Sequence, residues 1–184
     1  SIVLDPYDIY QMNKHLGVKF EELLNHKISL HAEEGLILPN LKMQGKEDGC
    51  AFLNEKGRCT IHAFRPGFCR LFPLGRIYED GSFSYYLQSQ ECTKANRTKV
   101  KVNKWLGIPD LKQYENFVNE WHYFLKDTKA LLLRLSDAQL NQELSMYLLN
   151  RFYTTAFDLE IDFYKQFDER MIQMKKLIYT LGRQ

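Results

Sequence analysis

The sequence lacks the features that identify several large classes of protein. No apolar run approaches the roughly 20 residues that a helix needs to cross a bilayer, and the first residues, SIVLDPYD, have neither the basic start nor the cleavage site of a signal peptide. The sequence has no glycine-rich nucleotide loop, and its formal net charge is only +2. We therefore expect no membrane span, no nucleic-acid partner and a reducing cytoplasmic location.

Cysteine is scarce and unevenly distributed. The four cysteines are Cys50, Cys59, Cys69 and Cys92, in the spacing C-x8-C-x9-C-x22-C, and none follows residue 92. The tight C-x2-C pairs that mark zinc knuckles are absent. However, the cysteines share one third of the chain, and the first three each lie near a glycine, where backbone can wrap around an ion.

These four sulfurs admit three interpretations. Four thiolates suit tetrahedral zinc or an iron–sulfur cluster, because soft sulfur ligands select these metals over magnesium or calcium. The cysteines can equally be buried apolar side chains without a ligand, since free cysteine is among the most buried residue types. The third interpretation is that the cysteines form disulfides, but a reducing compartment disfavours disulfide bonds.

The first half of the chain alternates short elements with turns. The pattern predicts a helix that starts at Asp5-Pro6 and stops at Gly17, and a second helix over 18–26. One or two strands are expected within 28–43, followed by a turn at 54–57 and one helical turn from Arg65-Pro66 to Pro73. A hairpin over 76–87 turns around Asp80-Gly81. The mixture of turns and short elements indicates an irregular region rather than a regular sheet.

The second half shows the 3.6-residue periodicity of helices. We expect helices over 100–106, 109–135 and 158–181, with Gly182 as the last stop, and a further helix that a capping box at Ser136–Gln139 opens and that runs to about residue 153. Tyr114, Phe117, Trp121 and Phe124 fall on one face of the long helix and are predicted core residues.

Together these patterns predict a mainly α fold. An irregular cysteine-rich metal-binding half with short β-hairpins precedes a helical, bundle-like C-terminal half. We place the boundary between a cysteine cluster domain, residues 1–106, and a helical extension packed on it, residues 107–184.

One stretch resembles a known family. Cys50-Ala51-Phe52-Leu53, Cys59-Thr60-Ile61-His62 and Arg65-Pro66-Gly67-Phe68-Cys69-Arg70-Leu71-Phe72-Pro73 are similar to three successive motifs of the YkgJ-type cysteine cluster family, the CxxCxxCC zinc- or iron-chelating domain. Leu4-Asp5-Pro6-Tyr7-Asp8-Ile9 resembles that family's first helix. The resemblance covers about residues 2–106, and the Arg-Pro to Phe-Pro segment is its most specific part.

The resemblance implies a metal site with Cys50, Cys59, Cys69 and Cys92 as thiolate ligands of zinc or iron. The family's namesake C-x2-C-x2-C-C segment normally precedes the first helix and is not in this sequence. We therefore expect that the chain is a fragment or a processed product whose upstream cysteines complete the ligand set. A relative with similar cysteine spacing is a flagellin lysine methylase, which implies methyl transfer as a conceivable activity.

Three functional hypotheses follow. The first is a metal-binding protein of the cysteine cluster family. The second is a metal-dependent or methyl-transferring enzyme that modifies proteins, motivated by the relative alone. The third is an interaction module whose helices after residue 107 bind another protein, and it requires exposed apolar side chains on those helices.

Three polar residues near the cysteines could have either a functional or a structural role. Arg65 and Arg70 could offset the charge of a thiolate cluster, but we favour a scaffolding role in which Arg65 bonds a carboxylate or a carbonyl. His62 has the C-x2-H spacing of a ligand, although the resembling family usually has tyrosine there, so we expect a surface or packing histidine.

Overall fold

The computed structural model describes residues 2–45, 48–91, 98–135 and 137–183. Its elements in chain order are α1 (Pro6–Leu16), α2 (Phe20–His26), β1 (Ile28–Glu33), β2 (Leu36–Leu41), β3 (Met43–Gln44), β4 (Gly49–Cys50), the 3-10 turn η1 (His62–Phe64), α3 (Gly67–Leu71), β5 (Leu74–Glu79), β6 (Ser82–Leu87), α4 (Val102–Leu106), α5 (Leu111–Leu135), α6 (Ala138–Leu149), the π-helical turn η2 (Asn150–Thr154) and α7 (Phe163–Leu181). The expected fold class, mainly α with short antiparallel hairpins and C-terminal helices, is confirmed.

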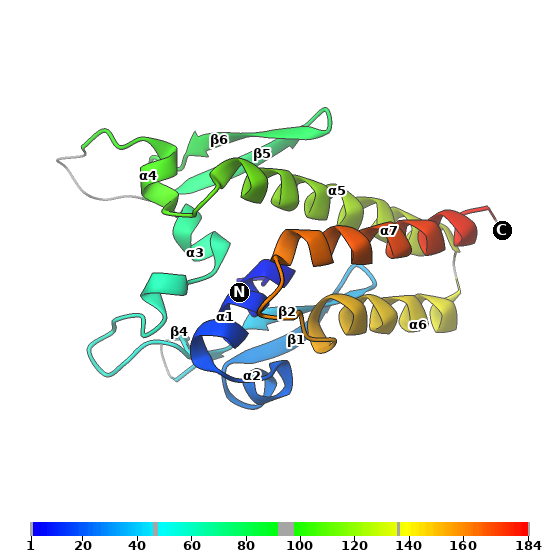
Figure 1. Ribbon diagram of the computed structural model, residues 1–184, viewed down its shortest axis with the longest axis horizontal. Coiled ribbons are helices and arrows are strands. Elements are labelled where there is room, and N and C mark those ends of the chain that lie inside the picture. Colours follow the sequence, from blue (N-terminus) through cyan, green and yellow to red (C-terminus); the bar gives the residue numbers. More distant parts are fainter. Residues whose placement is uncertain (1, 46–47, 92–97, 136, 184) are drawn as a thin grey trace.

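The elements form two regions that differ in regularity. Figure 1 shows α5, α6 and α7 along the long axis of the molecule, with the β5–β6 hairpin outside α5. The short elements η1, α3 and α4 lie at one end, and α1 lies near the centre beside the β1–β2 hairpin. The cysteine-bearing segments therefore occupy one end of the molecule, away from the far ends of the long helices.

The predicted hairpins and turns are present. β1 and β2 pair antiparallel with Ile28 opposite Leu41, and β5 and β6 pair around a tight turn in which Asp80 and Gly81 both have positive φ. Such a turn matches the twist of its strands. The second hairpin begins at Leu74, two residues before the predicted start.

The C-terminal helices differ from expectation at their ends. α7 begins at Phe163 rather than 158, because Asp162 is the N-cap and its carboxylate accepts the backbone N–H of Lys165 at 3.0 Å. The predicted helix to residue 153 ends at Leu149 and continues as η2. Asp137 caps α6 by accepting the N–H of Leu140, whereas Ser136 lies outside the described residues.

One hydrophobic core serves both halves of the chain. The predicted stripe of Tyr114, Phe117, Trp121 and Phe124 is buried, with each side chain 6% exposed or less. It packs in the same cluster as Leu4 and other side chains of α1, α2, β2 and α7. The boundary proposed at residue 106 stays a prediction, since this shared core marks no division there.

Buried polar contacts also join the two halves. The Tyr153 hydroxyl of η2 donates to the carbonyl of Leu4 at 3.0 Å. In β2, the N–H of Ile37 donates to the hydroxyl of Ser145 on α6 at 2.7 Å. Each bond fixes the helical half against the N-terminal segment, because a buried partner left unpaired would be costly.

The N-terminus of α1 is a reciprocal capping box. The Asp5 carboxylate accepts the N–H of Asp8 at 2.8 Å, and the Asp8 carboxylate accepts the N–H of Asp5 at 3.1 Å. The other oxygen of Asp8 accepts the N–H of Gly67 at 2.8 Å, 59 residues further along the chain. Asp8 is only 4% exposed, so this one side chain holds α3 on α1.

None of the helices in the described ranges combines the length and the apolar character needed to cross a bilayer.

Replacement of Asp8 should be more destabilising than loss of an ordinary helix cap. We expect Asp8→Ala to lower the free energy of unfolding by about 3 kcal/mol, because the N–H groups of Asp5 and Gly67 both lose their acceptor. Asp137→Ala, which removes only the exposed cap of α6, should cost about 1 kcal/mol. Urea denaturation measures both, and equal losses would contradict the bridging role of Asp8.

The same capping box predicts how stability depends on pH. Withdrawal from water raises the pKa of Asp5 to about 6, and burial together with the charge of Asp5 raises the pKa of Asp8 well above its usual range. In the unfolded chain both return to about 3.9, so between about pH 4 and 6 the folded protein binds more protons. Stability should therefore rise as the pH falls through this window.

Urea unfolding between pH 4 and 7 measures this dependence. Asp5→Asn keeps a capping side chain but removes one titrating group, so it should flatten the dependence. An equally steep curve for Asp5→Asn would show that other groups cause it.

Candidate metal centre

Three of the four predicted ligands lie in the described part of the chain, each on a different local structure. Cys50 ends β4 and pairs with Met43 of β3, Cys59 forms an isolated bridge with Leu53, and Cys69 lies in the middle of α3. All three are free, half-buried and packed against the core. Cys92, the fourth predicted ligand, lies outside the described residues.

Asn54 builds the turn that presents Cys59. Its side-chain oxygen accepts the N–H groups of Lys56 and Arg58, both at 3.0 Å, and its carbonyl accepts the N–H of Gly57 at 2.8 Å. An Asn side chain that bonds backbone groups two to four residues ahead closes a tight loop without other support. The predicted turn at 54–57 is thus confirmed.

Two contacts place α3, and hence Cys69. At its start, Gly67 lies directly against the hydroxyl of Tyr114, so that a Cβ at this position would lie 2.0 Å from that oxygen. Only glycine fits here, and its N–H is the group that Asp8 holds. The sequence motif that predicted one helical turn after Arg65-Pro66 is therefore explained by close approach of the backbone to α1 and α5.

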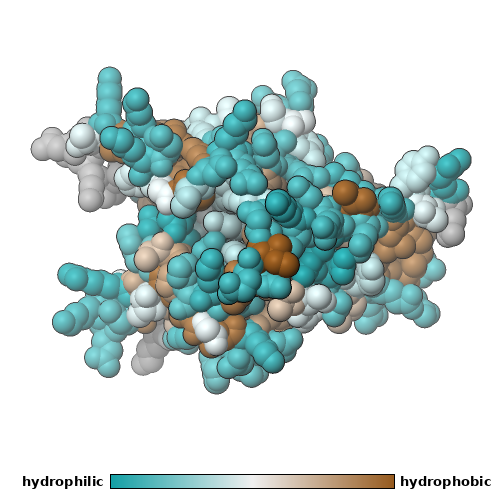
Figure 2. All heavy atoms as spheres, viewed as in Figure 1, coloured by the Kyte–Doolittle hydropathy of each residue, from teal (hydrophilic) through white to brown (hydrophobic). Residues whose placement is uncertain are grey.

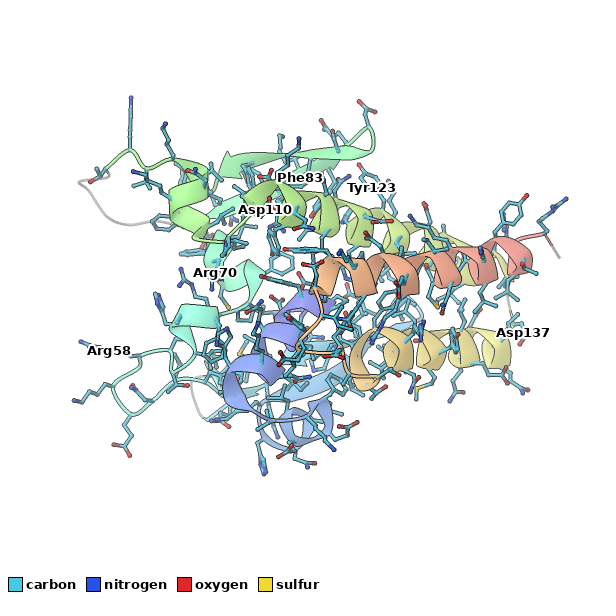
Figure 3. All side chains as sticks on the ribbon, viewed as in Figure 1. Arg58, Arg70, Phe83, Asp110, Tyr123 and Asp137 are labelled. Atoms are coloured by element: carbon cyan, nitrogen blue, oxygen red, sulfur yellow. The ribbon has the colours of Figure 1, made fainter. Side chains whose placement is uncertain are left out.

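Arg70 fixes the other side of α3. Its guanidinium donates to three carbonyls, those of Ala63, Arg65 and Leu106. The bond to Leu106 reaches the last turn of α4, and Figure 3 shows Arg70 beside α3 near this junction. The predicted scaffolding role is thus confirmed for Arg70.

Arg65 and His62 also have the structural roles that we predicted, a scaffolding bond and a surface position. Arg65 Nη1 donates to the His62 carbonyl at 2.8 Å and lies 3.3 Å from the ring nitrogen Nδ1 of the same residue. His62 is exposed at the start of η1. The expected surface histidine and the expected Arg65–carbonyl bond are both confirmed.

The pKa of Cys69 reflects its burial and the charges around it. Burial, together with the charges of Asp8, Cys50 and Cys59, raises the pKa of Cys69 to about 12, while Arg65 acts in the opposite direction. The thiols of Cys50 and Cys59 therefore act on the charge of Cys69. That these cysteines are ligands of one metal ion stays a prediction.

The donor set suits a soft cation, although the described side chains do not complete a site. Sulfur ligands favour zinc and iron. Within residues 2–45, 48–91, 98–135 and 137–183, no three His, Cys, Asp or Glu side chains converge closely enough to hold an ion. The structure thus brings the three predicted cysteines into one neighbourhood without closing a ligand shell around them.

The contribution of Asp8 could not be found from the sequence. Its position in the first turn of a helix signals a cap, and the bond inside α1 is the expected one. Its second bond joins residues 59 apart, and no local pattern signals a contact of that length.

The described part of the chain thus carries three half-buried free cysteines on short elements, which precede the long helices. The sequence model of the CxxCxxCC family, described as a "putative zinc- or iron-chelating domain", matches residues 1–104. The chain belongs to this family. No curated protein and no solved structure matches the chain.

The raised pKa of Cys69 predicts slow alkylation in the metal-free protein. Because the thiolate is the nucleophile, iodoacetamide at pH 8 and in the presence of a chelator should modify Cys69 at least about tenfold more slowly in the folded chain than in urea. Peptide mass spectrometry follows this residue alone. Equal rates in the two states would contradict a protected thiol.

Proposed function

We propose that this chain chelates zinc or iron through the thiolates of Cys50, Cys59 and Cys69, with Cys92 as the fourth ligand. Membership of a family of chelating domains supports metal binding in general. The residue assignment is supported by three free, half-buried cysteines from separate segments, two of which, Cys50 and Cys59, act on the charge of the third.

The chemistry of the donors is consistent with this proposal. A bound zinc ion or iron–sulfur cluster would take thiolates, so it would supply the charge that lets each cysteine release its proton. Arg65 already favours the thiolate form of Cys69. Because the thiol pKa is otherwise high, binding should weaken as the pH falls and proton competition grows.

Bonds that do not involve sulfur position the segments that carry Cys59 and Cys69. The Asn54 turn holds the segment that ends at Cys59, and the Asp8 and Arg70 bonds hold α3 with Cys69. The sulfur atoms remain reduced and free of disulfides. These are the properties of groups kept available for a ligand.

The two alternative hypotheses remain open predictions. Large apolar side chains are exposed on the helices after residue 107, among them Leu133 on α5, Met146 on α6 and Tyr179 on α7. The face seen in Figure 2 is mostly hydrophilic, with small separate apolar areas. An interaction module requires exposed apolar side chains, and the outer surface has them. However, these side chains are spread over three helices. For the enzyme hypothesis, we find no supporting contact in the described residues.

Metal content tests the main proposal. Anaerobically purified protein should contain zinc or iron above the buffer level by elemental analysis, with a visible absorption band if the metal is a cluster. Loss of one thiolate from a four-sulfur shell should lower the affinity by at least about 100-fold, so Cys69→Ser should purify with less than half of the metal.

Two further variants make this test specific. Thr60→Ser, next to Cys59, keeps a hydroxyl for the carbonyl of Phe52 and should retain the full metal content. Cys92→Ser tests the fourth ligand and should lose metal as Cys69→Ser does. The proposal is wrong if the wild-type protein holds neither metal, or if Cys69→Ser holds as much as wild type.

A further inference from the structure

β6 is an edge strand that lacks the usual protection against pairing with another chain. It pairs with β5 in a two-stranded sheet, and Figure 1 shows it along the margin of the molecule. Its sequence, SFSYYL over Ser82–Leu87, has no charge and no proline. Soluble proteins usually place lysine, proline or a bulge on such an edge, because its free backbone groups attract another strand. The composition of β6 is typical of strands that pair with copies of themselves.

The backbone of β6 offers a row of free donors and acceptors. The N–H of Gln88 donates to the Pro73 carbonyl at 3.0 Å, and bonded pairs alternate with non-bonded pairs along an antiparallel ladder. Phe83, Tyr85 and Leu87 are therefore the residues of β6 whose N–H and C=O groups point away from β5. Among the residues that the structure describes, none bonds these groups. They can thus form a second ladder.

The other edge of the hairpin faces its own chain. Four of the six residues of β5 line a cavity of about 500 Å³, and the walls of this cavity include Ile2, Val3 and residues of α3. Successive residues of a strand point to opposite faces. Because Leu74 and Gly75 both line the cavity, it lies at the edge of β5 rather than on one face. β6 is therefore the edge that is open to another molecule.

Opposite charges lie at the two ends of the hairpin. The tip carries Glu79 and Asp80, which are both exposed. α4 lies at the open end, because the indole N–H of Trp105 donates at 3.2 Å to the carbonyl of Phe72, just before β5. The exposed side chain of Lys101 precedes α4. None of these three charged side chains forms an ion pair with a described residue.

We propose that β6 pairs antiparallel with β6 of a second copy of this chain, which gives a dimer with a four-stranded sheet. A two-fold axis relates the two strands, so the same residues make the contact on both sides. The tip of each hairpin then lies beside the open end of the other, and the acidic tip faces Lys101 of the partner subunit. One six-residue strand makes a smaller contact than a standard interface of about 1,600 Å², so the dimer is weak and reversible. The inference does not depend on metal binding.

Sedimentation velocity on the whole chain tests for the dimer. With a reductant present, so that no intermolecular disulfide forms, the protein should change from monomer to dimer between about 1 and 500 μM, with a dissociation constant of about 10 to 100 μM. In hydrogen exchange, the N–H groups of Phe83, Tyr85 and Leu87 should be more strongly protected in the concentrated sample. A monomer at the highest concentration, or a dimer without this protection, would overturn the proposal.

Ser84→Lys and Ile77→Lys form a matched pair. Ser84 of β6 and Ile77 of β5 are exposed and lie opposite each other in the hairpin, so each variant adds a positive charge to the same face. Ser84→Lys places it on the pairing strand and should weaken the dimer at least about tenfold, whereas Ile77→Lys, one strand away, should change it less than about twofold. Equal losses in the pair, or no loss with Ser84→Lys, would contradict pairing through β6.

Charge reversal tests the orientation of the two copies. Glu79→Lys should weaken the dimer about fivefold, because it places a lysine beside the lysine at the open end of the partner hairpin. The addition of Lys101→Glu should restore the wild-type dissociation constant to within about twofold. Within one chain the two residues belong to opposite ends of the hairpin, roughly 20 Å apart, so this rescue requires a second copy. A double variant that dimerises more weakly than Glu79→Lys alone would overturn the antiparallel arrangement.

Discussion

The hydrogen bond from the Gly67 N–H to the Asp8 carboxylate determines how the cysteine-bearing end meets the rest of the protein. It is buried, it joins α1 to α3, and the same carboxylate closes the cap of α1. Because Gly67 also lies against Tyr114 of α5, three elements meet at one backbone N–H group. The orientation of Cys69, about half a helical turn from this point, follows from that junction.

Around this junction the chain buries more polar groups than a simple core requires. Asp8 and the hydroxyl of Tyr114 are enclosed, and the guanidinium of Arg76 lies over the rings of Phe83, Tyr85 and Tyr114. Such networks cost free energy when they are incompletely paired, whereas a core of leucine and phenylalanine would not. Natural proteins accept this cost chiefly at sites of function.

Local chemistry in the sequence predicted most of the elements. Asp5-Pro6, Asn54–Gly57 and Asp80-Gly81 each carry their own hydrogen-bond or dihedral preference, so their structures could be predicted from a few residues. The start of α7 was placed too early, because Asp158 and Asp162 both suit a helix cap and only tertiary packing chooses between them. The clustering of Cys50, Cys59 and Cys69 in the sequence predicts a shared site, and this stays a prediction. The Asp8–Gly67 bond and the close approach of Gly67 to Tyr114 depend on contacts between distant segments, which no local pattern encodes.

The Asn54 turn has a consequence for the thermodynamics of any ion that binds at the cysteines. Its backbone is already closed by Asn54 itself, so the nine-residue step from Cys50 to Cys59 is ordered without sulfur. A cross-link across a loop that is already ordered removes little chain entropy from the native state. Binding free energy at such a preorganised loop goes into affinity rather than into folding, unlike a zinc finger that unfolds when its metal is removed.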